Sequence, residues 1–152
     1  MSTNESRVHV SWRGARRYDV SRPGAAVMTI DGNRAAGPGP VEALLASLAA
    51  CSAIDVVDYL DKRRTPAARL EIAVDAERNA TPPRRVLRAR LDFTIDGEGI
   101  DTAHAERSIA LAFGTYCSVA ATLAPDVVLS TRLILNGVAG ADVVHRAGMA
   151  QA

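Results

Sequence analysis

Residues 40–59, PVEALLASLAACSAIDVVDY, are almost continuously apolar. The Gly-Pro-Gly before them interrupts any earlier element, and proline suits the first turn of a helix, so the sequence predicts a helix from Pro40 to about Arg64. Its first four turns, up to Val57, are apolar on nearly every face, whereas a helix on a protein surface has one apolar stripe. We therefore expect this helix to be enclosed on all sides.

Alternating apolar and polar residues predict strands before and after this helix. The expected strands cover residues 8–12, 18–20, 26–30, 70–76, 87–95 and 127–135. The first three form a small antiparallel meander, and opposite charges on the outer faces of the next two favour antiparallel pairing. Asp101 or Thr102 is expected to cap a second helix that Gly114 interrupts, with a short helical piece at 116–123. This order predicts an α+β fold in which antiparallel sheet wraps the long central helix.

Length and composition limit the protein to few classes. The 152 residues suffice for one domain, which we place at residues 1–136, followed by an Ala/Gly-rich tail without clear periodicity at 137–152. A formal net charge of +1 gives no field that would attract nucleic acid or anionic lipid, so neither is expected as a partner. The N-terminus lacks the apolar core of a signal peptide, and no run approaches the roughly 18 apolar residues of a membrane span. We therefore expect a cytoplasmic protein.

Two cysteines, Cys51 and Cys117, are the residues best suited to chemistry. A buried cysteine is often only a small apolar residue, and a permanent disulfide is not expected in a reducing cytoplasm. The two are therefore either reduced core residues or a pair that cycles between thiol and disulfide. The histidines share no metal-ligand spacing with them, so we expect neither a metal ion nor another cofactor.

Two segments, PGPVEALLASLAAC and TYCSVAATL, place these cysteines 66 positions apart. In this order and spacing they resemble the osmotically inducible protein C and organic hydroperoxide resistance family, over about residues 8–135. The best likeness is to a less characterised branch with a Cys-x-Ala-Ile-Asp-Val-Val helix and a Tyr-Cys-Ser-Val segment. The resemblance implies an intertwined homodimer and a thiol-dependent peroxidase, which reduces small organic hydroperoxides with electrons from a lipoyl-type or other dithiol.

In this family a peroxidatic cysteine on the long helix attacks the O–O bond, and a second cysteine resolves the sulfenic acid that forms. By position these are Cys51 and Cys117. Because Cys51 lies in mid-helix in apolar surroundings, its ionisation needs a nearby cation. The family supplies an arginine from the first hairpin, which corresponds to Arg17 or, as second choice, Arg16. Neighbouring strand positions face opposite sides, so only one of these arginines is expected to face the thiol.

One departure from the family's peroxidases concerns a glutamate. Those enzymes orient the arginine with a glutamate directly after the helix-starting proline, whereas here Val41 stands in that place. Glu42 comes one position, or about 100°, later. It is either a substitute for that glutamate or a first-turn carboxylate favoured by the helix dipole.

Two further departures lie close to the cysteines. Asp55 follows Cys51 by one turn on the same helix face and opposes thiolate formation unless an arginine pairs with it. It is either a member of the site or a structural ion-pair partner. Ser118 follows Cys117 where the peroxidases have proline.

These residues leave three functions open. The first is organic hydroperoxide reduction, with Cys51 attacking, Cys117 resolving and an arginine stabilising thiolate and transition state. The second is a non-enzymatic protein of the same fold that senses redox state or binds a small ligand, because the shifted Glu42 and Asp55 have removed peroxidase activity. The third is a structural dimer with inert cysteines. Proximity of the two sulfur atoms favours the first function over the others.

Overall fold

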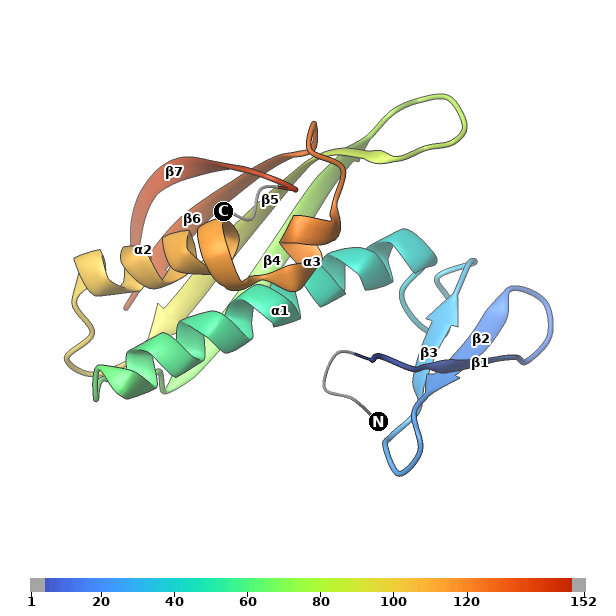
Figure 1. The fold of residues 1–152 in the computed structure, drawn as a ribbon, viewed down its shortest axis with the longest axis horizontal. Coiled ribbons are helices and arrows are strands. Elements are labelled where there is room, and N and C mark those ends of the chain that lie inside the picture. The colour runs from blue at the N-terminus through green and yellow to red at the C-terminus, as the bar shows by residue number, and fades with distance from the viewer. Residues whose placement is uncertain (1–4, 149–152) are drawn as a thin grey trace. The chain divides into compact units, whose positions relative to one another are not determined.

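The computed structural model describes residues 5–148. The chain forms two compact units, one ending at Ala46 and the other beginning at Ser47, and helix α1 continues across this boundary (Figure 1). The first unit contains β1 (His9–Trp12), β2 (Arg17–Ser21), β3 (Met28–Asp31) and the start of α1 (Pro40–Lys62). The second contains the rest of α1, β4 (Arg69–Arg78), β5 (Val86–Asp96), α2 (Thr102–Leu111), the π-helical turn η1 (Ala112–Tyr116), α3 (Ser118–Thr122), β6 (Val128–Leu135) and β7 (Val138–Arg146). The predicted α+β fold with a long helix is confirmed.

The first unit is the antiparallel meander β1-β2-β3 that the sequence predicts. Gly14, between β1 and β2, has a φ of +95°. Residues with a Cβ atom rarely adopt this conformation, so glycine lets the chain reverse there. After β3 the buried carboxylate of Asp31 accepts hydrogen bonds from the backbone N–H groups of Asn33, Ala35 and Ala36. These three bonds fix the loop that leads to α1.

Helix α1 begins with a local capping arrangement. The Gly39 N–H donates to Oε2 of Glu42 at 2.7 Å, and Oε1 of Glu42 lies 3.0 Å from Nε of Arg34. A carboxylate in the first turn satisfies a backbone donor and interacts favourably with the helix dipole. The geometry therefore agrees with the interpretation of Glu42 as a first-turn carboxylate.

The second unit is built on a sheet with the strand order β4-β5-β6-β7. β4 and β5 are antiparallel, as their opposite charges predict, with Asp75 opposite Arg90 and Glu77 opposite Arg88. β5 and β6 are parallel, so this sheet is mixed, whereas the sequence suggested antiparallel strands throughout. Parallel neighbours need a crossover connection, and residues 97–127 provide one with α2, η1 and α3. Figure 1 shows α2 lying along the sheet, where it contacts β6.

Helix α1 contributes one fully buried stripe to the second unit. Its members recur every four residues and have no exposed area: Leu48, Ser52, Val56 and Leu60. Ile54, on another face, is 63% exposed. A single chain therefore covers only part of the helix that we expected to be enclosed.

The apolar character of α1 also corrects one expectation from the sequence. By length and composition alone, this helix is long and apolar enough to cross a membrane. The core helix of a soluble protein meets the same criterion, so the property is weak evidence for a membrane span. The buried stripe shows that part of its apolar surface serves the core.

Two elements differ from the sequence-based expectations. The segment 137–152, which we described as a tail, contains β7, and this strand pairs antiparallel with β6. The interruption expected at Gly114 is the π-helical turn η1, in which the Cys117 N–H donates to the carbonyl of Ala112 at 2.8 Å. The expected cap of α2 is present, since the Asp101 carboxylate accepts from the His104 N–H.

Candidate thiol site

The second unit brings the two cysteines together. Cys51 is half-buried in the middle of α1, and Cys117 is buried directly before α3. The two thiols lie close enough for Cys51 to raise the pKa of Cys117, and no disulfide joins them. Residues far apart in sequence therefore form one dithiol site, which is the arrangement that a disulfide cycle requires.

The environment of Cys117 keeps it protonated at neutral pH. The pKa of this thiol is raised from 9.0 to about 11, with burial as the largest cause and the nearby Cys51 as a further one. Opposing these effects, the Ala120 N–H donates to Sγ of Cys117 at 3.4 Å, which favours the thiolate. Since the thiolate is the nucleophile, Cys117 is poorly suited to the first attack on a peroxide.

The π-helical turn η1 positions Cys117. Its residue Phe113 packs edge-on against Phe93 of β5, with ring centroids 6.3 Å apart. On its other side Phe113 stacks on His145 of β7 at 4.9 Å. These contacts hold the turn against the sheet, and the chain leaves it at Cys117 in an extended conformation. A π-turn of this kind inside a helix is frequent at functional sites.

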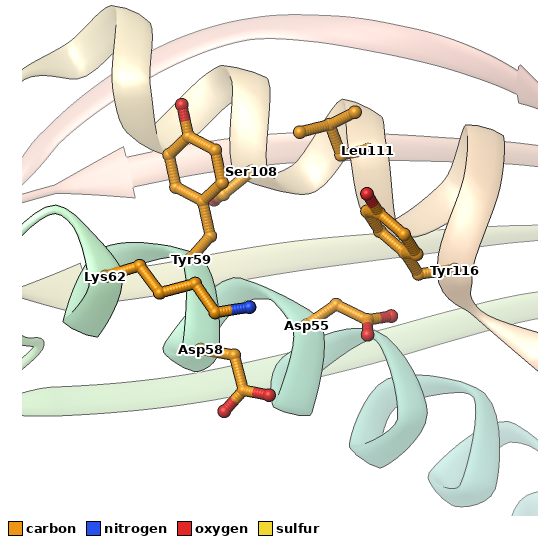
Figure 2. Close-up of a pocket in the computed structure, with 7 residues that line it drawn as sticks. All are labelled: Asp55, Asp58, Tyr59, Lys62, Ser108, Leu111 and Tyr116. Atoms are coloured by element: carbon orange, nitrogen blue, oxygen red, sulfur yellow. The ribbon is translucent and has the colours of Figure 1, made fainter.

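A cavity of about 410 Å³ borders residues that adjoin the two cysteines. Its lining residues come from α1, α2 and η1, as Figure 2 shows: Asp55, Asp58, Tyr59, Lys62, Ser108, Leu111 and Tyr116. Asp55 is one helical turn after Cys51, and Tyr116 directly precedes Cys117. The volume falls within the range of about 300–1,000 Å³ that is usual for small-molecule sites.

Among residues 5–148, Asp55 has no arginine partner. It takes part in none of the ion pairs formed among residues 5–148, and its Oδ2 is buried without a hydrogen bond. Burial, followed by the charge of Asp58, raises the pKa of this carboxyl group. An arginine paired with Asp55, which we expected if the thiol is active, is therefore not present in the described part of the chain. Asp55 is not a structural ion-pair partner there either.

The remaining predicted site residues belong to the first unit. Arg16 and Arg17 are exposed, and Arg17 starts β2 opposite Asp31 of β3. The pKa of Asp31 is lowered mainly by hydrogen bonds from backbone N–H groups. The positive charge of Arg17 lowers it further. Glu42 pairs with Arg34, a residue that sequence reasoning did not select, rather than with Arg16 or Arg17.

Sequence reasoning also missed most of the cavity lining. Along α1 the polar members follow Cys51 at the spacing of one helix face: Asp55, Asp58, Tyr59 and Lys62. Polar residues at this spacing on an otherwise apolar helix were a readable signal. The contributions of Ser108 and Tyr116 depend on how α2 and η1 pack, which the sequence pattern does not show.

The sequence and the fold match a known class of proteins. Residues 31–132 match the family described as OsmC-like protein, and the chain belongs to this family. Protein YhfA of Escherichia coli strain K12 is 36% identical over 95 residues, which cover 62% of this chain and 71% of YhfA.

Solved structures support the fold assignment. An OsmC-like protein from Mycoplasma pneumoniae is similar with a TM-score of 0.75 at 17% identity, over 88% of this chain and 98% of that one. The organic hydroperoxide resistance protein OhrB of Bacillus subtilis is similar with a TM-score of 0.54 at 15% identity, over 86% of this chain and 98% of that one. At these identities the likeness concerns the fold.

Proposed function

We propose that this protein is a thiol-dependent peroxidase that reduces small organic hydroperoxides in the cytoplasm. The observation that carries the proposal is the proximity of Cys51 and Cys117, with a cavity of about 410 Å³ that borders residues next to both. Cys51 attacks the O–O bond as a thiolate and becomes a sulfenic acid, which Cys117 then converts to a disulfide. A dithiol, of lipoyl or other type, reduces that disulfide. Family members described as organic hydroperoxide resistance proteins support this choice.

The division of labour follows from the two environments. Cys117 is buried and its pKa is raised to about 11, so it stays a thiol until a sulfenic acid forms next to it. Cys51 is the more accessible of the two. A guanidinium from the first hairpin, Arg17 or Arg16, stabilises the Cys51 thiolate in this proposal.

Mass spectrometry after a stoichiometric pulse of cumene hydroperoxide tests the proposal. Wild type is expected to lose two hydrogens per chain as it forms an intramolecular disulfide that dithiols reverse. Cys117→Ser should gain one oxygen, held as a sulfenic acid on Cys51, and over-oxidise in excess peroxide. Cys51→Ser should not change, because a serine hydroxyl is too weakly ionised to replace a thiolate.

A second candidate is a non-enzymatic protein that binds a small ligand or senses redox state. Two observations favour it. Glu42 binds Arg34 and the Gly39 N–H at the helix start, and Asp55 has no cationic partner in the part of the chain that the structure describes. If wild type keeps both thiols at peroxide concentrations that oxidise a known peroxidase, this candidate replaces the first.

A further inference from the structure

The cavity lined by Asp55 and Tyr116 contains an unneutralised carboxyl group. Oδ2 of Asp55 is buried and lacks a hydrogen-bond partner. Titratable groups facing the same cavity are Asp58, Tyr59 and Lys62 from α1 and Tyr116 from η1 (Figure 2). None of them forms a hydrogen bond or ion pair with Asp55 in the described part of the chain. Because a buried carboxylate without a partner is costly, burial raises the pKa of this group and so increases its protonated fraction at a given pH.

The position of this carboxyl group relates it to both thiols. Asp55 follows Cys51 by four residues on α1, so the two side chains project from the same helix face. Tyr116 borders the same cavity and is joined directly to Cys117. The cavity therefore borders residues that adjoin both cysteines, one through the helix face and one through the chain.

Peroxide reduction by a thiolate has a chemical need that a carboxyl group can meet. When the thiolate takes the terminal oxygen of an alkyl hydroperoxide, the O–O bond breaks and an alkoxide begins to leave. An alkoxide is a strong base and a poor leaving group, so a positioned acid that protonates it speeds the step, typically by 10²–10⁴-fold. A carboxylic acid is a stronger acid than Cys117, whose pKa is raised to about 11, and than the arginines selected from the sequence, so it suits this task better.

We propose that Asp55 is the proton donor of this reaction and that the cavity binds the organic part of an alkyl or aryl hydroperoxide. The inference rests on the proposed peroxidase function. The Cys51 thiolate, the hydroperoxide and the Asp55 carboxylic acid give Cys51 sulfenic acid, the alcohol and the Asp55 carboxylate. A sulfur–oxygen bond forms, the O–O bond breaks, sulfur is oxidised and the peroxide is reduced. Solvent that enters the cavity returns the proton to Asp55 before the next turnover.

Leaving-group dependence tests this role in the full-length protein. Peracetic acid transfers an oxygen atom in the same way but releases acetate, which needs no proton, whereas t-butyl hydroperoxide releases a strongly basic alkoxide. We compare the rates of single-turnover Cys51 oxidation by both oxidants, using rapid quenching and mass spectrometry. Asp55→Asn should react about 100-fold or more slowly with t-butyl hydroperoxide and at nearly the wild-type rate with peracetic acid.

The controls separate this inference from the function on which it rests. Asp61→Asn makes the same change at an exposed position of α1 outside the cavity and should match wild type with both oxidants. A retained rate of Asp55→Asn with peracetic acid also shows that the site is folded. Equal slowing with both oxidants, or no slowing with either, overturns the role of Asp55 while the peroxidase function stands. A wild type that is inert toward both oxidants overturns both.

Discussion

The ring of His145 is half-buried in the second unit. It stacks on Phe113, and its Nε2 lies 2.8 Å from Oγ1 of buried Thr131. Burial lowers the pKa of His145 from its ordinary value of 6.5. The unfolded chain therefore binds this proton at a higher pH than the folded protein does, and protonation favours unfolding.

We expect the free energy of unfolding to decrease as the pH falls below about 6.5, since the unfolded state then binds a proton that the folded state does not. His145→Phe keeps an aromatic ring against Phe113 and should remove this slope between about pH 5 and 7. It also leaves the Thr131 hydroxyl unpaired, at a cost of about 1–3 kcal/mol at all pH values. Urea unfolding over this pH range measures both effects.

His104→Phe is the matched control, because this ring lies at the start of α2 and is not enclosed by the aromatic core. The control should keep the wild-type slope. If the unfolding free energy of His145→Phe depends on pH as in wild type, the pH dependence comes from other groups.

The two candidate arginines can be separated by the reactivity of Cys51. If a guanidinium stabilises the Cys51 thiolate, its removal lowers the thiolate fraction at neutral pH, and alkylation by iodoacetamide slows. We expect a slowing of about 10-fold for Arg17→Ala and little change for Arg16→Ala, with the order reversed if Arg16 faces the thiol. Cys117→Ser serves as the background in which a single thiol is followed. If neither substitution changes the rate of Cys51 alkylation between pH 6 and 9, the arginines of the hairpin do not activate the thiol.

At the scale of secondary structure, the cap of α2 offers a measurable contribution. The Asp101 carboxylate accepts a hydrogen bond of 3.2 Å from the His104 N–H. Removing such a cap usually costs about 1 kcal/mol, which for a chain of this length lowers the melting temperature by about 2–4 °C. Asp101→Ala should show this decrease by calorimetry. Thr102→Ala, one residue later, provides the control and should stay close to wild type.

Elements with local sequence signals were predictable. The proline before Val41, the charge alternation of β4 against β5 and the Asp101 cap are each readable within a few residues, and the structure contains all three elements. β7 was not predictable, because its residues are nearly all exposed and it has no apolar period. The parallel pairing of β5 with β6 depends on how residues 97–127 pack, and no local pattern encodes this.

The site was predictable to a similar extent. The two cysteines were identified from their spacing and context, and the structure brings them together. The partner of Glu42 was not foreseen, since Arg34 reaches it through a loop whose shape is set by hydrogen bonds to Asp31. The absence of a partner for Asp55 in the described chain likewise follows from tertiary packing.

At the scale of the whole molecule, several large apolar side chains are exposed to solvent. Ile54 on α1 is 63% exposed, Trp12 on β1 is 65% exposed and Val144 on β7 is 70% exposed. Single exposed apolar residues are ordinary, but those on α1 belong to a helix that is apolar on nearly every face. A second copy of the chain would cover this surface, and intertwined dimers are what the family resemblance implies.

We expect a homodimer that buries well above about 2,000 Å² in total, stable at micromolar concentration. Ile54→Glu should weaken the dimer and yield monomer by light scattering, because a carboxylate would replace an apolar contact. Arg84→Glu changes an exposed charge in the loop between β4 and β5 and should leave the mass unchanged. A wild-type protein that is monomeric at these concentrations would contradict the assembly.

The crossover between β5 and β6 has a consequence for the newly synthesised chain. Cys117 lies within residues 97–127, so its place beside Cys51 depends on a parallel strand pair that closes only after β6 has left the ribosome. Until then the nascent chain carries two separate thiols, neither of which can rescue the other from irreversible oxidation. Pairing of β6 with β5 is therefore the folding step after which the two thiols can protect each other.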